Sequence, residues 1–127
     1  MSRRYLESQE QRLFVKRFRM DPRTKMLAAC AIPNAGRRSP VTAGILKAEG
    51  MEAGVPDWFL FHPGLGLDDG EHVGLALEFK SPTGKGRVSR EQRSWHLELS
   101  YSGWRVEIVT SSEQAWDVVC NYLRINL

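Results

Sequence analysis

The sequence predicts an α/β fold in which helices flank a mixed β-sheet, and three patterns indicate it. In the first twenty residues apolar side chains recur at helical spacing. The segments "DWFLFH" (57–62) and "VGLALEFKS" (73–81) are largely apolar on both faces, which is typical of strands covered on both sides of a sheet. The turn-rich "PGLGLDDGE" between them predicts that these two strands are antiparallel neighbours.

The remaining elements follow from capping signals and periodicity, and the expected order is α-β-α-β-β-α-β-α. Ser39 caps and Pro40 opens the second helix. The segment "MLAACAI" (26–32) favours a strand, although a helix also fits. The expected elements are a helix over 5–19, a strand within 26–32, a helix from 40 to 47 or 49, strands at 57–62 and 73–81, a helix from about 89, a strand at 104–109 and a helix from 111 or 112.

Composition indicates one globular domain spanning 1–127, since 42% of the 127 residues are hydrophobic and 26% are charged. No apolar run is long enough to span a bilayer, and the basic, polar start lacks the apolar core of a signal peptide. Cys30 and Cys120 stand alone in apolar surroundings. We therefore expect reduced core thiols in a cytoplasmic protein.

The net charge of +3 weakly favours a polyanionic partner, and basic residues gather in three clusters. For each cluster, a solvated face is an equally open interpretation. The clusters are Arg3, Arg4, Arg12, Lys16, Arg17, Arg19, Arg23 and Lys25; Arg37 and Arg38; and Lys80, Lys85, Arg87, Arg90 and Arg93.

The strand at 73–81 carries an unexpected pair of charges near its end. Because side chains alternate along a strand, Glu78 and Lys80 emerge on one face and Phe79 on the other. Gly74 and Ala76 precede them on the same face and leave room for a ligand to approach. The pair is either a plain salt bridge or part of a reactive site.

Asp57 opens the neighbouring strand, which is otherwise apolar. Aspartate at such a position is often a turn or cap residue. If the two strands form a hairpin, however, Asp57 falls near Glu78. Two carboxylates at one end of a sheet repel unless a cation lies between them, and oxygen ligands favour Mg²⁺. On the first helix, Glu7 and Glu10 both point toward the apolar face, so either is a candidate third carboxylate.

The order "PD…EFK", with Asp57, Glu78 and Lys80, matches the pattern of PD-(D/E)xK nucleases. The bare pattern is weak, but "ESQEQ", "PNAGRRS", "LKAEGMEAGVPD", "LEFKS" and "GRVSREQRSW" occur in order around it. Together they span nearly the whole chain. The sequence closely resembles the VRR-NUC family in its stand-alone phage and bacterial form, which implies a restriction-endonuclease-like core.

The resemblance implies a role for each matching residue. Asp57 and Glu78 would bind Mg²⁺ or Mn²⁺ together with the main-chain carbonyl of Phe79. Lys80 would orient or activate the attacking water. Gln92 matches the glutamine that follows the Glu-x-Lys strand, and Glu7 fits the first-helix acid better than its rival Glu10.

Gln92 also has a purely structural interpretation, since Ser89-x-x-Gln92 is a capping box. Five basic residues are candidate contacts to the DNA backbone. They are Arg37 and Arg38, ahead of a helix N-terminus that favours phosphate, and Lys85, Arg87 and Arg90, on and beyond a basic loop.

Other candidates carry less weight. The spacings of His62, His72 and His96 do not form a zinc site, and Trp58, Trp95, Trp104 and Trp116 fall on core positions. The sequence thus predicts a Mg²⁺- or Mn²⁺-dependent DNA endonuclease, and the resemblance suggests a homodimer acting on branched DNA such as four-way junctions. Alternatives are a flap- or end-directed nuclease, a non-catalytic DNA-binding module of the same fold, and a protein in which the charged pair is only a salt bridge.

Overall fold

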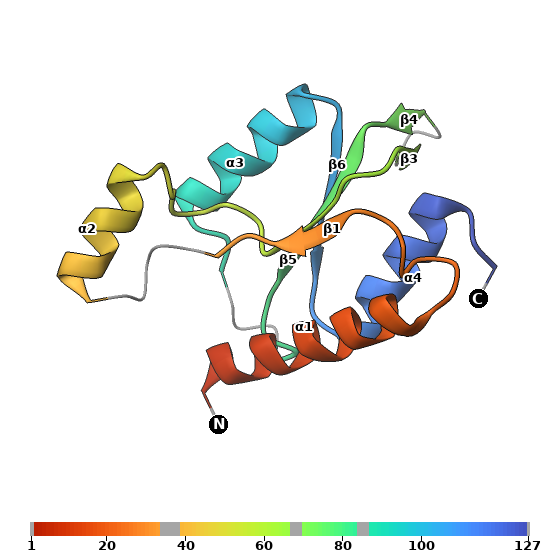
Figure 1. Ribbon diagram of the computed structural model, residues 1–127, viewed down its shortest axis with the longest axis horizontal. Helices are drawn as coiled ribbons and strands as arrows, with labels where there is room; N and C mark the ends of the chain where they lie inside the picture. The colour runs from red at the N-terminus through yellow and green to blue at the C-terminus, as the bar shows by residue number, and fades with distance from the viewer. Residues whose placement is uncertain (1, 34–38, 67–69, 84–86, 127) are drawn as a thin grey trace.

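A four-stranded mixed sheet lies at the centre of the computed structural model, with helices on both of its faces (Figure 1). Residues 2–33, 39–66, 70–83 and 87–126 are described. The elements are α1 Arg3–Met20, β1 Ala29–Ala31, α2 Pro40–Ala48, β2 Trp58–Leu60, β3 Gly64–Leu65, β4 Glu71–His72, β5 Gly74–Phe79, α3 Arg90–Tyr101, β6 Trp104–Val109 and α4 Ser112–Leu123. This order confirms the predicted α/β fold, with one addition.

The sheet has the strand order β1-β2-β5-β6. Strand β2 pairs antiparallel with β5, and Trp58 lies opposite Leu77, which confirms the predicted pairing. Strand β6 runs parallel to β5 after the crossover through α3. The addition is the small β3–β4 pair within the connection between β2 and β5. Strands of two residues are too short to leave a periodic pattern in the sequence.

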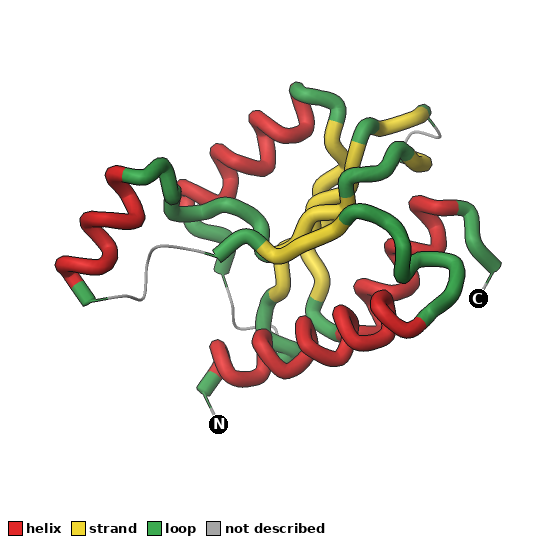
Figure 2. Tube along the Cα trace, viewed as in Figure 1, coloured by secondary structure: helices red, strands yellow, loops and turns green. Residues whose placement is uncertain are grey.

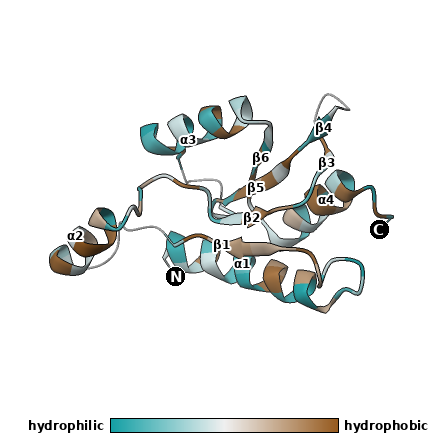
Figure 3. Ribbon diagram, turned by 45° about the horizontal axis from the view of Figure 1, so that its top comes forward, coloured by the Kyte–Doolittle hydropathy of each residue, from teal (hydrophilic) through white to brown (hydrophobic). Residues whose placement is uncertain are grey.

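The helices form two layers around the sheet (Figures 1 and 2). Helices α1 and α4 pack against each other and cover one face, while α3 packs against β6 on the other. Helix α2 lies at one end of the molecule and has no fully buried residue, although it carries much of the hydrophobic colour in Figure 3. No helix within the described part of the chain is long and apolar enough to cross a membrane.

Alternation along β5 divides the core into two parts. Leu75, Leu77 and Phe79 belong to the larger cluster with Phe14 of α1 and Trp116 of α4. The intervening residues point the other way, toward α3. Ala76 packs there in the smaller cluster with Phe59, and a Cβ on Gly74 would lie 2.4 Å from the Trp104 ring. Glu78 is the next residue on this second face.

One expectation about a single residue, Cys30, needs correction. Cys120 is buried as predicted, but Cys30 is exposed, because it lies on the edge strand β1 and points away from the face on which Ala29 meets the core. Trp58 and Trp116 are buried, whereas Trp95 and Trp104 are only partly covered. The strand interpretation of 26–32 is confirmed, but the strand covers only 29–31.

Candidate active site

A cleft of about 420 Å³ opens where the end of β5 meets the N-terminal half of α1. The five side chains that the sequence singled out for catalysis all line it. They are Glu7, Asp57, Glu78, Lys80 and Gln92. The rest of the lining is Arg3, Arg4, Ser8, Gln11, Ala31, Ile32, Pro33, Phe79 and Arg87. Residues from five separate parts of the chain therefore converge on one cleft.

The antiparallel pairing of β2 and β5 brings the two central acids together. Asp57 directly precedes β2, and its amide donates to the carbonyl of Leu77 at 3.0 Å. Its Oδ2 accepts a hydrogen bond of 2.7 Å from the amide of Phe79, the residue after Glu78. This second bond fixes the Asp57 carboxyl group at the end of β5.

Burial changes the protonation of this pair. Burial raises the pKa of Asp57 to about 7, and the nearby Glu78 charge adds to the increase, while the Phe79 amide opposes it. Burial also raises the pKa of Glu78. The two carboxyl groups lie close enough to interact directly. Near neutral pH the two carboxyl groups therefore tend to share a bound proton, and another cation could take the place of that proton.

Gln92 connects the acid pair to Lys80. Its Nε2 donates to Glu78 Oε2 at 3.2 Å, and its Oε1 accepts from Lys80 Nζ at 2.8 Å. The same Oε1 accepts from the Ser89 amide at 2.9 Å, and Ser89 Oγ accepts from the Gln92 amide at 3.1 Å. The predicted capping box is confirmed, and it holds the amide group that contacts both charged residues.

Lys80 is held by neutral oxygens. Besides Gln92, its Nζ donates to the main-chain carbonyl of Arg87 at 3.0 Å. Within the described residues no ion pair joins Lys80 to Glu78; the basic side chain nearest to Glu78 is His96, with Nε2 3.6 Å from Oε1. The plain salt bridge between Glu78 and Lys80, considered from the sequence, is therefore wrong.

His96 is a neighbour of the site that the sequence reasoning set aside. It lies one helical turn after Gln92, so both face β5. Burial lowers the pKa of His96, and the charge of Lys80 lowers it further. In the sequence, the feature that pointed to His96 is the helical face that it shares with Gln92. This feature alone does not distinguish a histidine packed in the core from one that contacts an acid.

The two acids of α1 occupy different surroundings. Glu7 lines the cleft with Asp57 and Glu78. Glu10 instead accepts a hydrogen bond of 2.9 Å from the amide of Ser112, the first residue of α4. Because the first amides of a helix lack intrahelical acceptors, Glu10 stabilises the start of α4.

The residues present fit a hard divalent cation. Among the described residues the buried Glu78 Oε1 has no hydrogen-bond partner, and His96 Nε2 lies 3.6 Å from it, so this oxygen remains available as a donor to a cation. Within the described residues no group of three or more His, Cys, Asp or Glu side chains has the geometry of a metal cluster. Mg²⁺, however, commonly uses one or two carboxylates and retains several waters, so the Asp57–Glu78 pair suffices.

The candidate DNA contacts are only partly placed. Arg37, Arg38 and Lys85 lie outside the described residues. Arg87 lines the cleft, whereas Arg90 is exposed at the first position of α3 and does not line it.

Comparison with known proteins agrees with this architecture. A solved structure described as a "VRR_NUC domain protein" superposes with a TM-score of 0.73 at 18% sequence identity, covering 94% of this chain and 89% of the other. No curated protein matches the chain. The sequence model of the VRR-NUC domain matches residues 5–113, which include α1 from its third residue, every element from β1 to β6 and the first two residues of α4. The chain thus belongs to the VRR-NUC family of nuclease-type domains.

Proposed function

We propose that this chain is a single-domain endonuclease that hydrolyses DNA phosphodiester bonds with the help of Mg²⁺ or Mn²⁺. The observation that supports this most is the pair formed by the partly buried Asp57 and the buried Glu78, linked through Gln92 to the amino group of Lys80 in one cleft. Buried carboxyl groups with raised pKa beside a cationic side chain are typical of active sites. A VRR-NUC domain makes phosphodiester chemistry the expected reaction.

The metal would be held by Asp57 and Glu78, with the carbonyl of Phe79 and the side chain of Glu7 as further oxygen donors from the same cleft. When bound, a divalent ion lowers the pKa of a coordinated water and neutralises charge on the phosphate. The unpartnered Glu78 Oε1 is the donor atom that favours this assignment.

The other side chains would act on the scissile phosphate and on the attacking water. Lys80 carries a positive charge in the cleft and is positioned by Gln92 and the Arg87 carbonyl. It would orient the water and stabilise the negative charge that develops on the phosphate. Arg87 would contact the DNA backbone from the cleft wall, and we propose Arg90, Arg37, Arg38 and Lys85 as further contacts to it.

We further propose branched DNA as the substrate, four-way junctions above all, and a homodimer as the active form. The support is the close resemblance to stand-alone VRR-NUC proteins of phages and bacteria, which also suggests the cytoplasm of a bacterial or phage-infected cell. A two-fold dimer presents two active sites with opposite polarity, which suits paired cuts across a junction.

The decisive experiment offers end-labelled four-way junction, flap and linear duplex DNA to the purified protein with Mg²⁺, Mn²⁺ or EDTA. Asp57→Ala and Lys80→Ala serve as matched inactive controls, and light scattering measures the oligomeric state. We expect metal-dependent cleavage that favours the junction and is absent from both variants.

Other results would change the proposal in defined ways. Preferred cleavage of flaps or ends would retain the chemistry and reject the junction specificity. DNA binding without cleavage in either metal would identify a non-catalytic DNA-binding module of the same fold. Full cleavage by Asp57→Ala would show that the acid pair is not the metal site.

A further inference from the structure

We infer that one flank of α1 is a track for the phosphate backbone of the DNA arm that leads into the cleft. We call this flank, formed by Arg4, Arg12, Lys16 and Arg19, the α1 basic strip. The inference rests on the proposed function, because it takes DNA as the partner. It extends the DNA-binding surface from Arg4, at the cleft, to Arg12, Lys16 and Arg19, which do not line the cleft.

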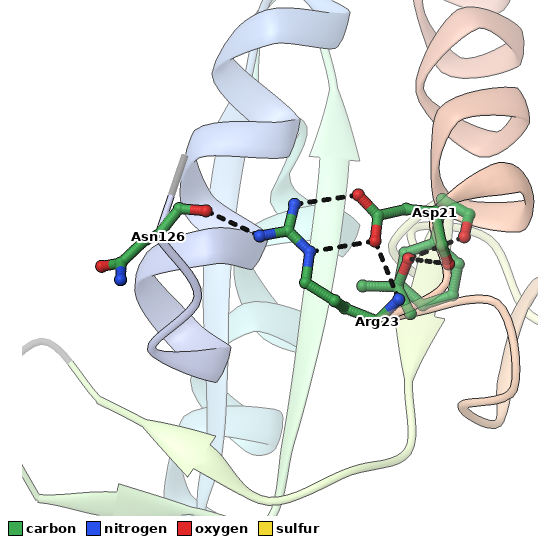
Figure 4. A network of polar contacts seen from close by, with 5 residues as sticks. Asp21, Arg23 and Asn126 are labelled. Atoms are coloured by element: carbon green, nitrogen blue, oxygen red, sulfur yellow. Dashed lines mark hydrogen bonds and ion pairs between the residues drawn. The ribbon is translucent and has the colours of Figure 1, made fainter.

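The basic residues near the N-terminus are not equivalent, and two of them already have structural partners. The guanidinium of Arg17 lies 4.6 Å from the centre of the Trp116 ring, on the side where α1 meets α4. Arg23 donates to both carboxylate oxygens of Asp21 and to the carbonyl of Asn126 (Figure 4). Its hydrogen bonds hold the pKa of Asp21 at about 2. These two cations serve the fold.

Among the described residues, no ion pair or ring contact of this kind involves the cations of the α1 basic strip. Arg12, Lys16 and Arg19 are exposed, and none of them takes part in an ion pair between described residues. The two acids of α1, both among the described residues, form no ion pair with Arg12, Lys16 or Arg19: Glu7 lines the cleft, as Arg4 does, and Glu10 binds the start of α4. The flank therefore carries positive charge that no acid of the same helix neutralises, unlike a surface helix with alternating signs.

The strip is continuous with the cleft. A shallow groove of about 500 Å³ runs along α1 and is lined by Arg12, Lys16 and Arg19, together with Ser8, Gln11 and the apolar Val15 and Met20. Ser8 and Gln11 also line the cleft, as does Arg4. From Arg4 to Arg19 the helix rises ~22 Å, which corresponds to about six base pairs of duplex. One end of the track thus meets the scissile phosphate, and the other lies well outside the cleft.

The chemistry of the strip suits phosphate rather than bases. Arginine binds phosphate oxygens through paired N–H groups, and a row of cations at helical spacing follows a regular backbone without reading sequence. The neutral polar side chains of Ser8 and Gln11 supply hydrogen-bond donors where the track enters the cleft. The expected signature is salt-dependent affinity that does not vary with DNA sequence.

The test compares two variants that lose the same charge. Arg12→Gln/Arg19→Gln removes two strip cations, and Lys47→Gln/Arg124→Asn removes two exposed cations from α2 and from the end of α4. Asparagine is chosen at 124 because this residue has a φ of 59°. Fluorescence anisotropy with a labelled four-way junction in EDTA measures the binding constant at several salt concentrations. Thermal unfolding verifies that both variants are folded.

We expect the strip variant to lower the slope of log K against log salt by about 1.8, the value for two phosphate contacts, and the control to leave it unchanged. In Mg²⁺ the strip variant should have a raised KM and a nearly unchanged kcat. Arg12→Lys/Arg19→Lys should restore most of the slope. Equal slopes in wild type and strip variant, or equal losses in strip variant and control, would overturn the track. Absence of cleavage by the wild type in either metal would instead reject the proposed function.

Discussion

Gln92 of α3 donates a hydrogen bond to Glu78 of β5, with 3.2 Å between Nε2 and Oε2. The same side chain completes the capping box at the start of α3. One residue thus connects the stability of a helix terminus to the position of a candidate metal ligand. The two roles can be separated experimentally, because Ser89 takes part in only one of them.

Ser89→Ala should cost about 1 kcal/mol of unfolding free energy and leave cleavage nearly unchanged, since Gln92 keeps its contacts to Glu78 and Lys80. Gln92→Ala should lower kcat roughly tenfold or more, because hydrogen bonds to charged groups contribute ~1.5–3 kcal/mol. Chemical denaturation and single-turnover cleavage measure the two effects. If Ser89→Ala loses as much activity as Gln92→Ala, helix capping alone explains the effect of substituting Gln92.

The two acids of α1 should respond in opposite ways. Glu10→Ala removes the acceptor for the Ser112 amide and should cost about 1 kcal/mol of stability, with cleavage retained. Glu7→Gln keeps the size of the side chain that lines the cleft. It should raise the Mg²⁺ concentration needed for half-maximal cleavage and leave the melting temperature unchanged. Magnesium titrations of cleavage, together with thermal unfolding, give both readouts. If the Mg²⁺ concentration needed for cleavage changes only in Glu10→Ala, Glu10 is the first-helix acid.

Gly54 lies against the start of α3 and should influence the site indirectly. A Cβ at this residue would lie 2.6 Å from the carbonyl carbon of Glu91 and 2.8 Å from the amide of Gln92. Gly54→Ala should therefore displace the first turn of α3, cost ~1–3 kcal/mol of stability and lower kcat. Gly50→Ala is the matched control, because Gly50 has a similar φ of 103° but no atom within 4 Å of the added Cβ. If both substitutions lower kcat equally, backbone strain rather than displacement of α3 is the cause.

The stability of the metal-free protein should fall as pH rises through the acid pair. Asp57 has a pKa of about 7 in the folded chain against 3.8 for the ordinary group, so the folded state binds the proton more tightly. Its contribution to stability is complete below about pH 4, declines up to about pH 7, and is constant above that. Melting temperatures measured in EDTA from pH 5 to pH 8 test this.

Asp57→Asn is the control for this pH dependence, because it removes the titrating group and keeps the shape of the side chain. We expect the decline between pH 5 and pH 7 to become smaller, with the remainder due to Glu78, whose pKa burial also raises. An unchanged slope in Asp57→Asn would show that other groups cause the decline.

Much of the architecture could be predicted from local sequence. Ser39, Ser89 and Ser111 were expected at helix starts, and each is an N-cap whose side chain accepts a backbone amide. Helix caps and apolar periodicity depend on residues a few positions apart, so they can be recognised in the sequence before the fold is known. The pairing of β2 with β5 was predictable for the same reason, since a short turn-rich connection separates them.

The errors and omissions arise where distant segments meet. Cys30 is exposed because β1 is an edge strand. Glu7 and Glu10 have different contacts because α4 begins beside Glu10. Both acids lie on the inward flank of one helix, so periodicity alone could not separate them.

The sequence by itself determined the order of the elements, the alternation that places Glu78 and Lys80 on one face at the end of β5, and the identity of the candidate reactive groups. Only the tertiary structure decided their partners: Gln92 between Glu78 and Lys80, His96 beside Glu78, and Glu10 at α4. The physical reason is range. Backbone propensity and side-chain periodicity are local, whereas burial, shifted pKa values and hydrogen bonds across α1, β5 and α3 exist only after the sheet has brought those elements together.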